Sequence, residues 1–498
     1  MPHVASSASA PLAVHSGRGP RSRCHPSGRG RAHSSRAEPV RPPAEPTPPP
    51  PGHADARRPG FDLALLSRIL PIQLVEEVIP QPGRGRLPLT RTFFLVLGLC
   101  LFPEAAYQEV LQLLWPRTSA DQSVPNKSSL SRARYRLGWS VMAELFATIA
   151  RPLAKIDTPG SFWGGLRLMA VDGLTLEVAD NCANEQAFGG QRDKQGNRVG
   201  PPLARLVGLV ECGTHALVDA ALGSYHDGEP ELAAKLVRWV AEGTLILADR
   251  GFFGVALWRA YLDASAHLLW RIKGNVATQV VSRLPDGTYL ARVRPSKRQG
   301  RWPAGQRPDP ILVRIIEYRI DGSAELYRLA TSLLDHRTAP ALALANLYAQ
   351  RWEFEITAAE LKTHQRGKAV VLRSRTPDGV RQEVWAHLIL HFGARSLMYE
   401  ASQTMAGDRD PDRLSITLTL RVIRRSLLRT PPLAHHGDPL ETAIAELIQP
   451  RALLHRRLRS YPRSVKRPDS RYPRAAPNPS KSGRRPLPPF IELAPAHC

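Results

Sequence analysis

The chain has 498 residues, 43% of them hydrophobic, and its 68 Lys and Arg outnumber 44 Asp and Glu to give a formal net charge of +24. At about 150 residues per domain this length predicts roughly three domains. A positive excess of this size indicates a polyanionic partner, usually nucleic acid. Residues 1–60 carry +6 and residues 451–498 carry +10, so the 390 residues between them carry only +8.

Cysteine usage and hydropathy exclude several classes of protein. The five cysteines are scattered without a Cys-x-x-Cys pair, which excludes a disulfide scaffold and a cysteine-rich zinc module and favours reduced thiols. The longest apolar run, 93–102, is far below the ~18 residues that a membrane span needs. No apolar signal segment is visible near the N-terminus. We therefore expect a cytoplasmic protein without a membrane partner.

Composition and hydrophobic period divide the chain into five predicted parts. Residues 1–60 contain thirteen prolines and too little apolar surface to fold, so they predict a disordered tail, which is either a functional arm or the product of an over-long reading frame. Residues 61–155 predict a helical domain. Residues 160–273 and 336–425 predict an α/β core with a mixed sheet, and 274–335 a β-rich, mostly antiparallel insertion. Residues 426–498 predict a basic region with a disordered tail.

One segment of the helical part, Lys127–Leu137, allows two interpretations. Apolar residues at a period near 3.6 predict helices over 61–78 and 92–102, and a further helix follows Pro103. Lys127–Leu137 predicts a short basic helix with serines as caps. It could be a recognition helix on DNA, with Arg132 and Arg134 as contacts, or a solvated face packed on its neighbours.

The α/β part is predicted in chain order. Two short strands, 168–171 and 174–178, lie on either side of Asp172-Gly173, and a hairpin covers 204–222. A helix over 229–241 leads to a buried strand, 244–248, that ends at Asp249. A helix over 253–264 and a strand over 267–272, with Trp270 packed in it, precede the insertion. One long helix spans 340–367, and Thr376-Pro377 starts another.

Two aspartates occupy comparable places in this pattern. Asp172 and Asp249 each follow a predicted buried strand and stand next to Gly or Arg-Gly. A carboxylate there can face a ligand at the edge of a sheet. Aspartate at a strand end is also a common turn former, so either residue alone is weak evidence of catalysis.

The long helix carries a stronger pattern. Tyr348, Arg351, Glu355 and Lys362 stand at offsets 0, 3, 7 and 14, which at about 100° per residue fall within a stripe about 60° wide. Such a stripe could be ion pairing on a surface helix. The alternative is a functional carboxylate, Glu355, flanked by groups that contact phosphates.

Three carboxylates brought together require bound cations. Oxygen-only ligands suit Mg²⁺ or Mn²⁺. Two such ions about 4 Å apart can hold the attacking and leaving oxygens of a phosphodiester displacement. Asp172, Asp249 and Glu355 are therefore the candidate catalytic and metal-binding residues.

These motifs resemble those of one known family. Tyr348-x2-Arg351-x3-Glu355-x6-Lys362 resembles the YREK signature of the IS4-family DDE transposases, and the aspartates in the AVDG and ADRGF segments resemble the family's two aspartates. Residues 372–392 are similar to the family's segment after the signature helix, and 61–116 to the family's helical N-terminal domain. The resemblance covers roughly 61–470.

The resemblance implies a fold and a reaction. The fold is an RNase H-like catalytic core with a β-rich insertion, preceded by a helical N-terminal DNA-binding domain. The reaction is cut-and-paste transposition, in which metal-dependent cleavage at the element ends proceeds through a DNA hairpin and is followed by strand transfer into target DNA. The partners are double-stranded DNA, as terminal inverted repeats and target, and a second copy of the chain in the synapse. The setting is the bacterial cytoplasm, on the nucleoid when DNA is bound.

The resemblance also implies roles for single residues. Tyr348, Arg351 and Lys362 hold the terminal phosphates and the hairpin. A tryptophan of the insertion stacks on a flipped base, and Trp302 is the candidate. Two other functions stay open: a catalytically silent, domesticated DNA-binding protein, and a metal-dependent nuclease without strand transfer.

Overall fold

The computed structural model describes residues 65–66, 70–79, 87–115, 124–295, 309–320, 325–348, 351–365, 371–428, 439–448, 453, 459–460, 485–486 and 491–494. The chain divides into two compact units, and all of these residues lie in the second, 51–498. The predicted tail 1–60, most of 449–498 and Trp302 lie outside the described residues. Within the described part, no helix is both long enough and apolar enough to span a membrane.

The N-terminal part is helical, as predicted. Its helices are α2 (Ile72–Val78), α3 (Leu89–Leu101), α4 (Tyr107–Leu114), α5 (Lys127–Leu137) and α6 (Ser140–Ile149). Helix α3 buries ten of its thirteen residues. Gly98 lets α4 approach closely, because a Cβ there would lie 2.7 Å from Cγ1 of Val110. The cap of α5 is Asn126, not a serine: its side chain accepts a hydrogen bond from the backbone N–H of Ser129 at 2.9 Å.

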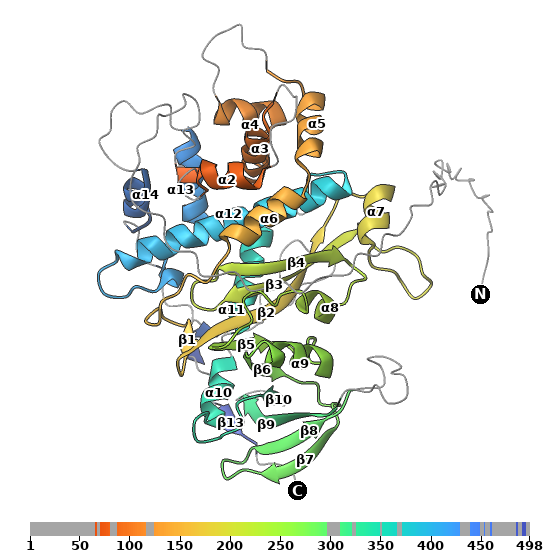
Figure 1. The fold of residues 1–498 in the computed structure, drawn as a ribbon, viewed down its shortest axis with the longest axis vertical. Coiled ribbons are helices and arrows are strands. Elements are labelled where there is room, and N and C mark those ends of the chain that lie inside the picture. The colour runs from red at the N-terminus through yellow and green to blue at the C-terminus, as the bar shows by residue number, and fades with distance from the viewer. Residues whose placement is uncertain are drawn as a thin grey trace, which may run out of the picture. The chain divides into compact units, whose positions relative to one another are not determined.

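A mixed sheet runs beneath these helices (Figure 1). Its strand order is β4-β3-β2-β5-β6-β10-β9-β8-β7. The strands are β1 (Phe162–Trp163), β2 (Leu166–Glu177), β3 (Leu203–Glu211), β4 (Leu217–Ser224), β5 (Thr244–Ala248), β6 (His267–Arg271), β7 (Thr278–Arg283), β8 (Tyr289–Val293), β9 (Ile311–Ile320) and β10 (Leu326–Thr331). The strands β2, β5 and β6 are parallel, and the other neighbours are antiparallel. The predicted hairpin is β3–β4, and β5 has its predicted bounds. Short strands β11 (Arg459–Ser460) and β12 (Arg485–Pro486) pair with each other, and β13 (Ile491–Leu493) pairs with β9.

The strands of the predicted insertion continue the core sheet. They are antiparallel to one another, as expected, and β10 pairs with β6. Trp270 on β6 is fully buried and packs edge-on against Trp258 and Tyr261. Trp270 is therefore a core residue, in agreement with its predicted place in a strand.

One strand replaces the two predicted around Asp172-Gly173. Strand β2 runs without interruption from Leu166 to Glu177. Asp172 pairs with Gly208 and Gly173 with Val207 of β3, so the ladder continues through both residues. The prediction that a strand ends before Asp172 was wrong because pairing with β3 satisfies the backbone there.

Helices cover the sheet and connect it to the N-terminal part. They are α7 (Cys182–Phe188), α8 (Glu229–Ala233), α9 (Val255–Asp263), α10 (Ala341–Tyr348), α11 (Trp352–Ala359), a π-helix η3 (Glu360–Gln365), α12 (Pro377–Gln403), a 3₁₀ turn η4 (Pro411–Arg413), α13 (Ile416–Leu428) and α14 (Pro439–Ile448). Helix α8 is shorter than the predicted 229–241, because turns with i→i+3 hydrogen bonds follow it.

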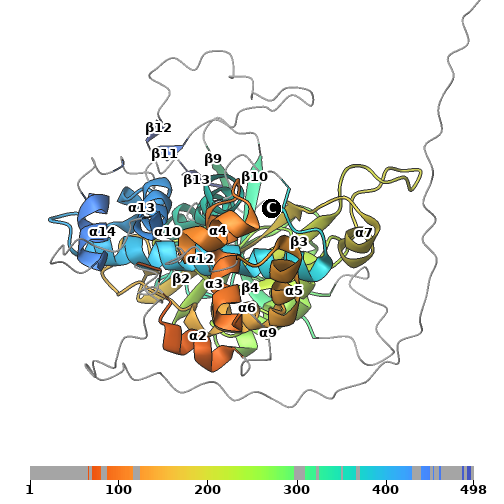
Figure 2. The same cartoon turned by 90° about the horizontal axis from the view of Figure 1, so that it is seen from above.

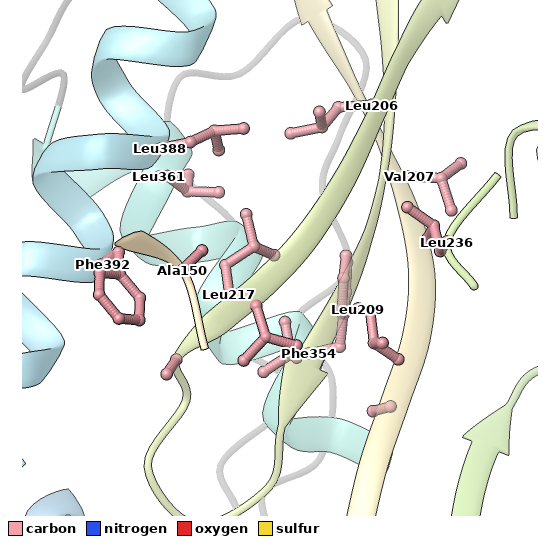
Figure 3. Packing of buried hydrophobic residues seen from close by; sticks show 14 of the residues in the cluster. Ala150, Leu206, Val207, Leu209, Leu217, Leu236, Phe354, Leu361, Leu388 and Phe392 are labelled. Atoms are coloured by element: carbon pink, nitrogen blue, oxygen red, sulfur yellow. The ribbon is translucent and has the colours of Figure 1, made fainter. Parts of the chain in front are cut away.

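Helix α12 lies between the N-terminal helices and the sheet (Figures 1 and 2). It begins as predicted, with Thr376 as cap and Pro377 at the first position, and twenty of its 27 residues are buried. It contacts α3 and α6 on one side and β4 on another. Leu388 of α12 projects toward the sheet, where Leu206 and Leu217 lie (Figure 3).

The helix predicted over 340–367 is not uniform in the residues that the structure describes. Helix α10 is described as far as Tyr348, α11 begins at Trp352, and a π-helix starts at Glu360. There the buried Glu360 carboxylate accepts hydrogen bonds from Arg395 and lies 3.1 Å from Nε2 of His391, both on α12. Because hydrogen bonds in a π-helix span one more residue than in an α-helix, the even angular spacing assumed for Lys362 does not hold.

Removing the charge of Arg395 tests this buried pair. Arg395→Met leaves the Glu360 carboxylate buried beside His391 alone, and we expect a loss of about 3–5 kcal/mol in the free energy of unfolding. The partners hold the pKa of Glu360 far below its ordinary value. The stabilisation is therefore present at neutral pH and is lost as the pH falls below about 4. Urea unfolding at pH 7 measures the effect.

Arg425→Met is the matched control, because Arg425 pairs with Glu446 while its side chain is 51% exposed. Such surface pairs contribute at most about 1 kcal/mol. Equal losses in the two variants would show that the Glu360–Arg395 pair has no special stabilising role.

Candidate active site

Asp172 and Asp249 meet where β5 ends beside β2. In the parallel register Val171 lies opposite Ala248. Asp172 is the next residue of β2, and Asp249 directly follows the end of β5. Both carboxylates therefore leave the sheet at the same level. Asp172 is half-buried in the middle of β2, and its Oδ1 accepts a hydrogen bond from the N–H of Gly173 at 2.8 Å.

Helix α11 brings Glu355 over this point of the sheet. Phe354, the preceding residue, is buried against β3 (Figure 3). A Cβ at Gly208 would lie 3.3 Å from Cε2 of Phe354, so glycine at this position lets the helix approach. Because Gly208 is also the pairing partner of Asp172, the close approach occurs at the level of the aspartate.

Arg351 links two of the three carboxylates. Its Nη1 donates to Oδ2 of Asp172 at 3.0 Å, and its Nη2 donates to Oε1 of Glu355 at 3.2 Å. The Arg351 side chain is only 11% exposed. Its Nε is buried and has no hydrogen-bond partner among the described residues. A single guanidinium thus supplies the positive charge between Asp172 and Glu355, and its Nε donor makes no hydrogen bond to the described residues.

The electrostatics of Asp172 are those of a crowded acidic site. Burial raises the pKa of Asp172 to about 6, and the neighbouring Asp249 and Glu229 act in the same direction. The hydrogen bond from Gly173 and the charge of Arg351 oppose this rise. Two further negative charges beside this half-buried carboxylate favour a bound cation.

Glu229 is a carboxylate at this site that the sequence did not single out. A Cβ at Gly173 would lie 2.8 Å from its Oε1, and one at Gly251 would lie 3.7 Å from its Oε2. Glu229 therefore lies between β2 and the turn that follows Asp249. It is the first residue of α8, where acidic residues are ordinary, so the sequence offered no signal for it.

The two remaining signature residues are in different environments. Tyr348 is buried, and its hydroxyl donates to the carbonyl of Ala248 at 3.2 Å, directly before Asp249. Lys362 lies in the π-helix and is exposed. Tyr348 thus has a contact that fixes the end of β5, whereas Lys362 can face a partner.

The other expected DNA contacts, Arg132 and Arg134, also lie in different environments. Arg132 is exposed on α5, and its guanidinium donates to Oγ of Ser129 at 3.5 Å. Arg134 is buried and donates to Gln382 and Ser374 of the α12 region at 2.8 and 3.1 Å. The structure thus gives Arg134 a role in holding α5 to α12. Trp302 lies outside the described residues.

The donor chemistry of the site fits a hard divalent cation. All four carboxylates offer oxygen ligands, which Mg²⁺ and Mn²⁺ prefer, and the Arg351 guanidinium acts as a stand-in positive charge. As these side chains are arranged, the described residues contain no group of three that could hold a metal ion.

Asp172→Asn tests how much the negative charge of Asp172 destabilises the folded protein. The pKa of Asp172 in the folded protein, about 6, lies above the unfolded value of about 3.9, so the charged form destabilises the fold. We expect the variant to be more stable by about 1–3 kcal/mol at pH 8. The advantage shrinks as the pH falls through 6 and disappears near pH 4. Thermal midpoints at pH 8, 6 and 5 measure it.

Asp263→Asn is the control, because Asp263 is exposed at the end of α9. We expect no stabilisation that depends on pH in this variant. An Asp172 variant with the same thermal midpoint as the parent at pH 8 would contradict the assigned electrostatics.

Comparison with known proteins agrees with the geometry. Residues 163–392 match the family described as transposase DDE domain, and residues 61–147 match insertion element 4 transposase N-terminal. The chain is 28% identical to transposase InsG for insertion sequence element IS4 of Escherichia coli (strain K12), over 84% of this chain and 95% of that protein. It is 24% identical to putative transposase y4zB of Sinorhizobium fredii (strain NBRC 101917 / NGR234), over 54% of this chain and 70% of that protein.

The first part of the chain to be matched is the N-terminal helices, and the second is the α/β part. The N-terminal match covers α2–α6, and the DDE match covers β2, β5 and α11, which carry Asp172, Asp249 and Glu355. The α/β part, with its mixed sheet, is accordingly RNase H-like. The chain belongs to the IS4 family of DDE transposases.

Proposed function

We propose that this transposase cuts the ends of its insertion element and joins them to target DNA in a metal-dependent reaction. The proposed pathway is cut-and-paste through a DNA hairpin, carried out by a homodimer in which each copy acts on bound terminal repeats. The observation that carries the proposal is the convergence of Asp172 and Glu355 on Arg351 at the point where β5 delivers Asp249.

The proposed ligands of the ions are the three carboxylates of the motif. Mg²⁺ or Mn²⁺, two ions per site in our proposal, would supply the positive charge that activates the attacking oxygen and stabilises the leaving oxygen. Asp172, Asp249 and Glu355 would hold these ions. Glu229, against Gly173 and Gly251, would add negative charge beside them.

Arg351 has two successive roles in the proposal. Without DNA its guanidinium neutralises Asp172 and Glu355. With cations held by these carboxylates, the guanidinium would be available to donate to a phosphate next to the scissile one. The open Nε donor supports this second role.

Tyr348 and Lys362 act differently in the proposal. Tyr348 positions Asp249 by its hydrogen bond to the carbonyl of Ala248. Lys362, exposed on the π-helix, contacts a DNA phosphate as a point charge. Trp302 remains our candidate for stacking on a flipped base.

The alternatives are less well supported. A silent DNA-binding derivative would have no need of several carboxylates around one half-buried arginine, an arrangement that destabilises a fold. A simple nuclease would not need the complete Tyr348, Arg351 and Lys362 set. Neither alternative is favoured by the similarity to transposases.

Amide substitutions test the catalytic assignment. We expect Asp172→Asn, Asp249→Asn and Glu355→Gln each to reduce cleavage to the level of the EDTA reaction, because each removes an anionic ligand while keeping the side-chain shape. The substrate is a supercoiled plasmid that carries the gene with its native flanks, incubated with Mg²⁺ or Mn²⁺. Binding of the same DNA should persist.

Asp263→Asn is the matched control and should cut at the parent rate. Discrete cuts by any one of the three amide variants would remove that residue from the catalytic set. Cuts by the parent protein in EDTA would exclude the metal requirement.

The salt dependence of binding tests Lys362. Lys362→Ala should lower the slope of log affinity against log salt by about 0.9, which corresponds to one phosphate contact. Lys155→Ala, which removes an exposed lysine before β1, serves as control and should leave the slope unchanged. Fluorescence anisotropy with the cut end as a duplex measures both. An unchanged slope in the Lys362 variant would exclude the contact.

A further inference from the structure

A second cluster of ionisable side chains is buried near the helix that carries Glu355. Its members are each at most 3% exposed, and they are Glu360, His391, Arg395, His215 and Asp412. None of them belongs to the candidate active site. Well-packed apolar residues in place of such a cluster are often at least as stable, so stability alone does not account for it.

Glu360 is at the centre of this cluster. Its Oε2 accepts a hydrogen bond from Nε of Arg395 at 3.1 Å and lies 3.1 Å from Nε2 of His391. Its Oε1 accepts a hydrogen bond from Nη2 of Arg395. A two-point contact between a guanidinium and a carboxylate fixes the direction of both groups as well as their distance. Helix α12 therefore sets the direction in which the Glu360 side chain points.

The π-helix η3 matches one face of α12. His387, His391 and Arg395 are four residues apart, so they share a face of that helix. Gln365, at the end of η3, donates from its Nε2 to the backbone carbonyl of His387 at 2.7 Å. In an α-helix, Glu360 and Gln365 would point about 140° apart. The π-helix, whose hydrogen bonds span five residues, lets both contact α12.

A residue in an uncommon backbone conformation supports Arg395 from another side. His215 lies between β3 and β4 and has a φ of 58°, in the left-handed region that few non-glycine residues adopt. Its Nδ1 lies 3.0 Å from Nη2 of Arg395. Because a guanidinium can only donate, this Nδ1 accepts. Its Nε2 lies 3.9 Å from Oδ1 of Asp412. Arg395 is thus held between Glu360 and His215.

Helix α11 is held on a different side by the sheet. Glu355 and Glu360 are five residues apart, so they point about 140° apart around the helix. Phe354 is buried close to Gly208 of β3, and Arg351 joins Glu355 to the central strand β2. The contacts of Glu360 involve no residue of the catalytic set. They can therefore hold the helix whatever occupies the active site.

We propose that Glu360 is a positioning residue of the cleavage reaction. Held by Arg395 and His391, it fixes η3 against α12. This contact sets the rotation of α11, which turns Glu355 toward the sheet and leaves Lys362 exposed. The inference rests on the proposed function and adds how the catalytic glutamate is kept in place. Since a displacement of about 1 Å can reduce a rate about 100-fold, a small rotation of this helix is enough to affect cleavage.

Replacing the whole pair separates positioning from stability. Glu360→Leu/Arg395→Met removes both charges, and apolar replacements of this kind are often neutral or stabilising. We expect the full chain to keep its thermal midpoint and its affinity for the end duplex in EDTA. Single-turnover cleavage at saturating protein and Mg²⁺ should fall about 10- to 100-fold. A purely structural pair predicts a rate that recovers with stability, so cleavage at the parent rate by this variant would overturn the proposal.

Two milder variants decide the question if the double variant does not fold. Arg395→Lys keeps the charge but not the two-point contact. His215→Asn keeps a residue that tolerates the left-handed backbone but removes the ring that contacts Arg395. Each should lower the single-turnover rate several-fold without changing affinity for the end duplex. The parent rate in both variants would contradict the role of Glu360.

Hydrogen exchange reports on α11 without DNA or metal. Loss of the Glu360 contacts in these variants should speed the exchange of backbone amides in 352–359 by about tenfold or more. Amides of β2 and β5 should keep their parent rates. Unchanged exchange in α11 would show that Glu360 does not hold this helix.

Asp286→Asn/Arg314→Met is the matched control. Arg314 on β9 is fully buried and pairs with Asp286 in the β7–β8 turn, outside α11 and α12. This variant should cut at the parent rate, and a loss equal to that of the Glu360 variant would overturn the proposal. A parent protein that cuts no element ends would refute the proposed function, and the exchange measurement would still decide whether Glu360 holds α11.

Discussion

The parallel register of β2 and β5 decides where the acidic residues of this protein can lie. Val171 lies opposite Ala248, and β5 ends there while β2 continues beside β3. Because β5 ends at this level while β2 continues, Asp172 is partly exposed although it lies on a central strand. A slip of one residue would turn Asp172 to the opposite face of the sheet. The register of the sheet therefore also fixes the position of the carboxylates.

The arginine of the signature explains how such a site remains folded. Burial disfavours the charged form of Asp172, the neighbouring carboxylates Asp249 and Glu229 add to this effect, and the pKa of Asp172 is raised as a result. The guanidinium of Arg351 supplies a positive charge between Asp172 and Glu355. The same side chain thus stabilises the protein at rest and, in our proposal, binds the substrate backbone once cations take its place.

The sequence predicted the helical N-terminal part, β5 and the start of α12, because apolar period, strand length and capping residues are local signals. It also predicted that Asp172, Asp249 and Glu355 lie together. It missed the continuous β2, since pairing with a distant strand overrides a local turn former. It missed Glu229 and the break at Glu360 for the same reason: each depends on a partner far along the chain, Gly173 or Arg395.

The position of α12 in the chain has a consequence for biosynthesis. Helices α3 and α6 bury their apolar faces against this helix, yet roughly 230 residues separate α6 from its start. At about 5–20 residues per second, synthesis of that stretch takes some ten to fifty seconds. During this time the N-terminal helices are complete but lack the surface that covers them. Nascent chains of this protein therefore carry exposed apolar helices until the last quarter of translation, which makes them substrates for chaperones.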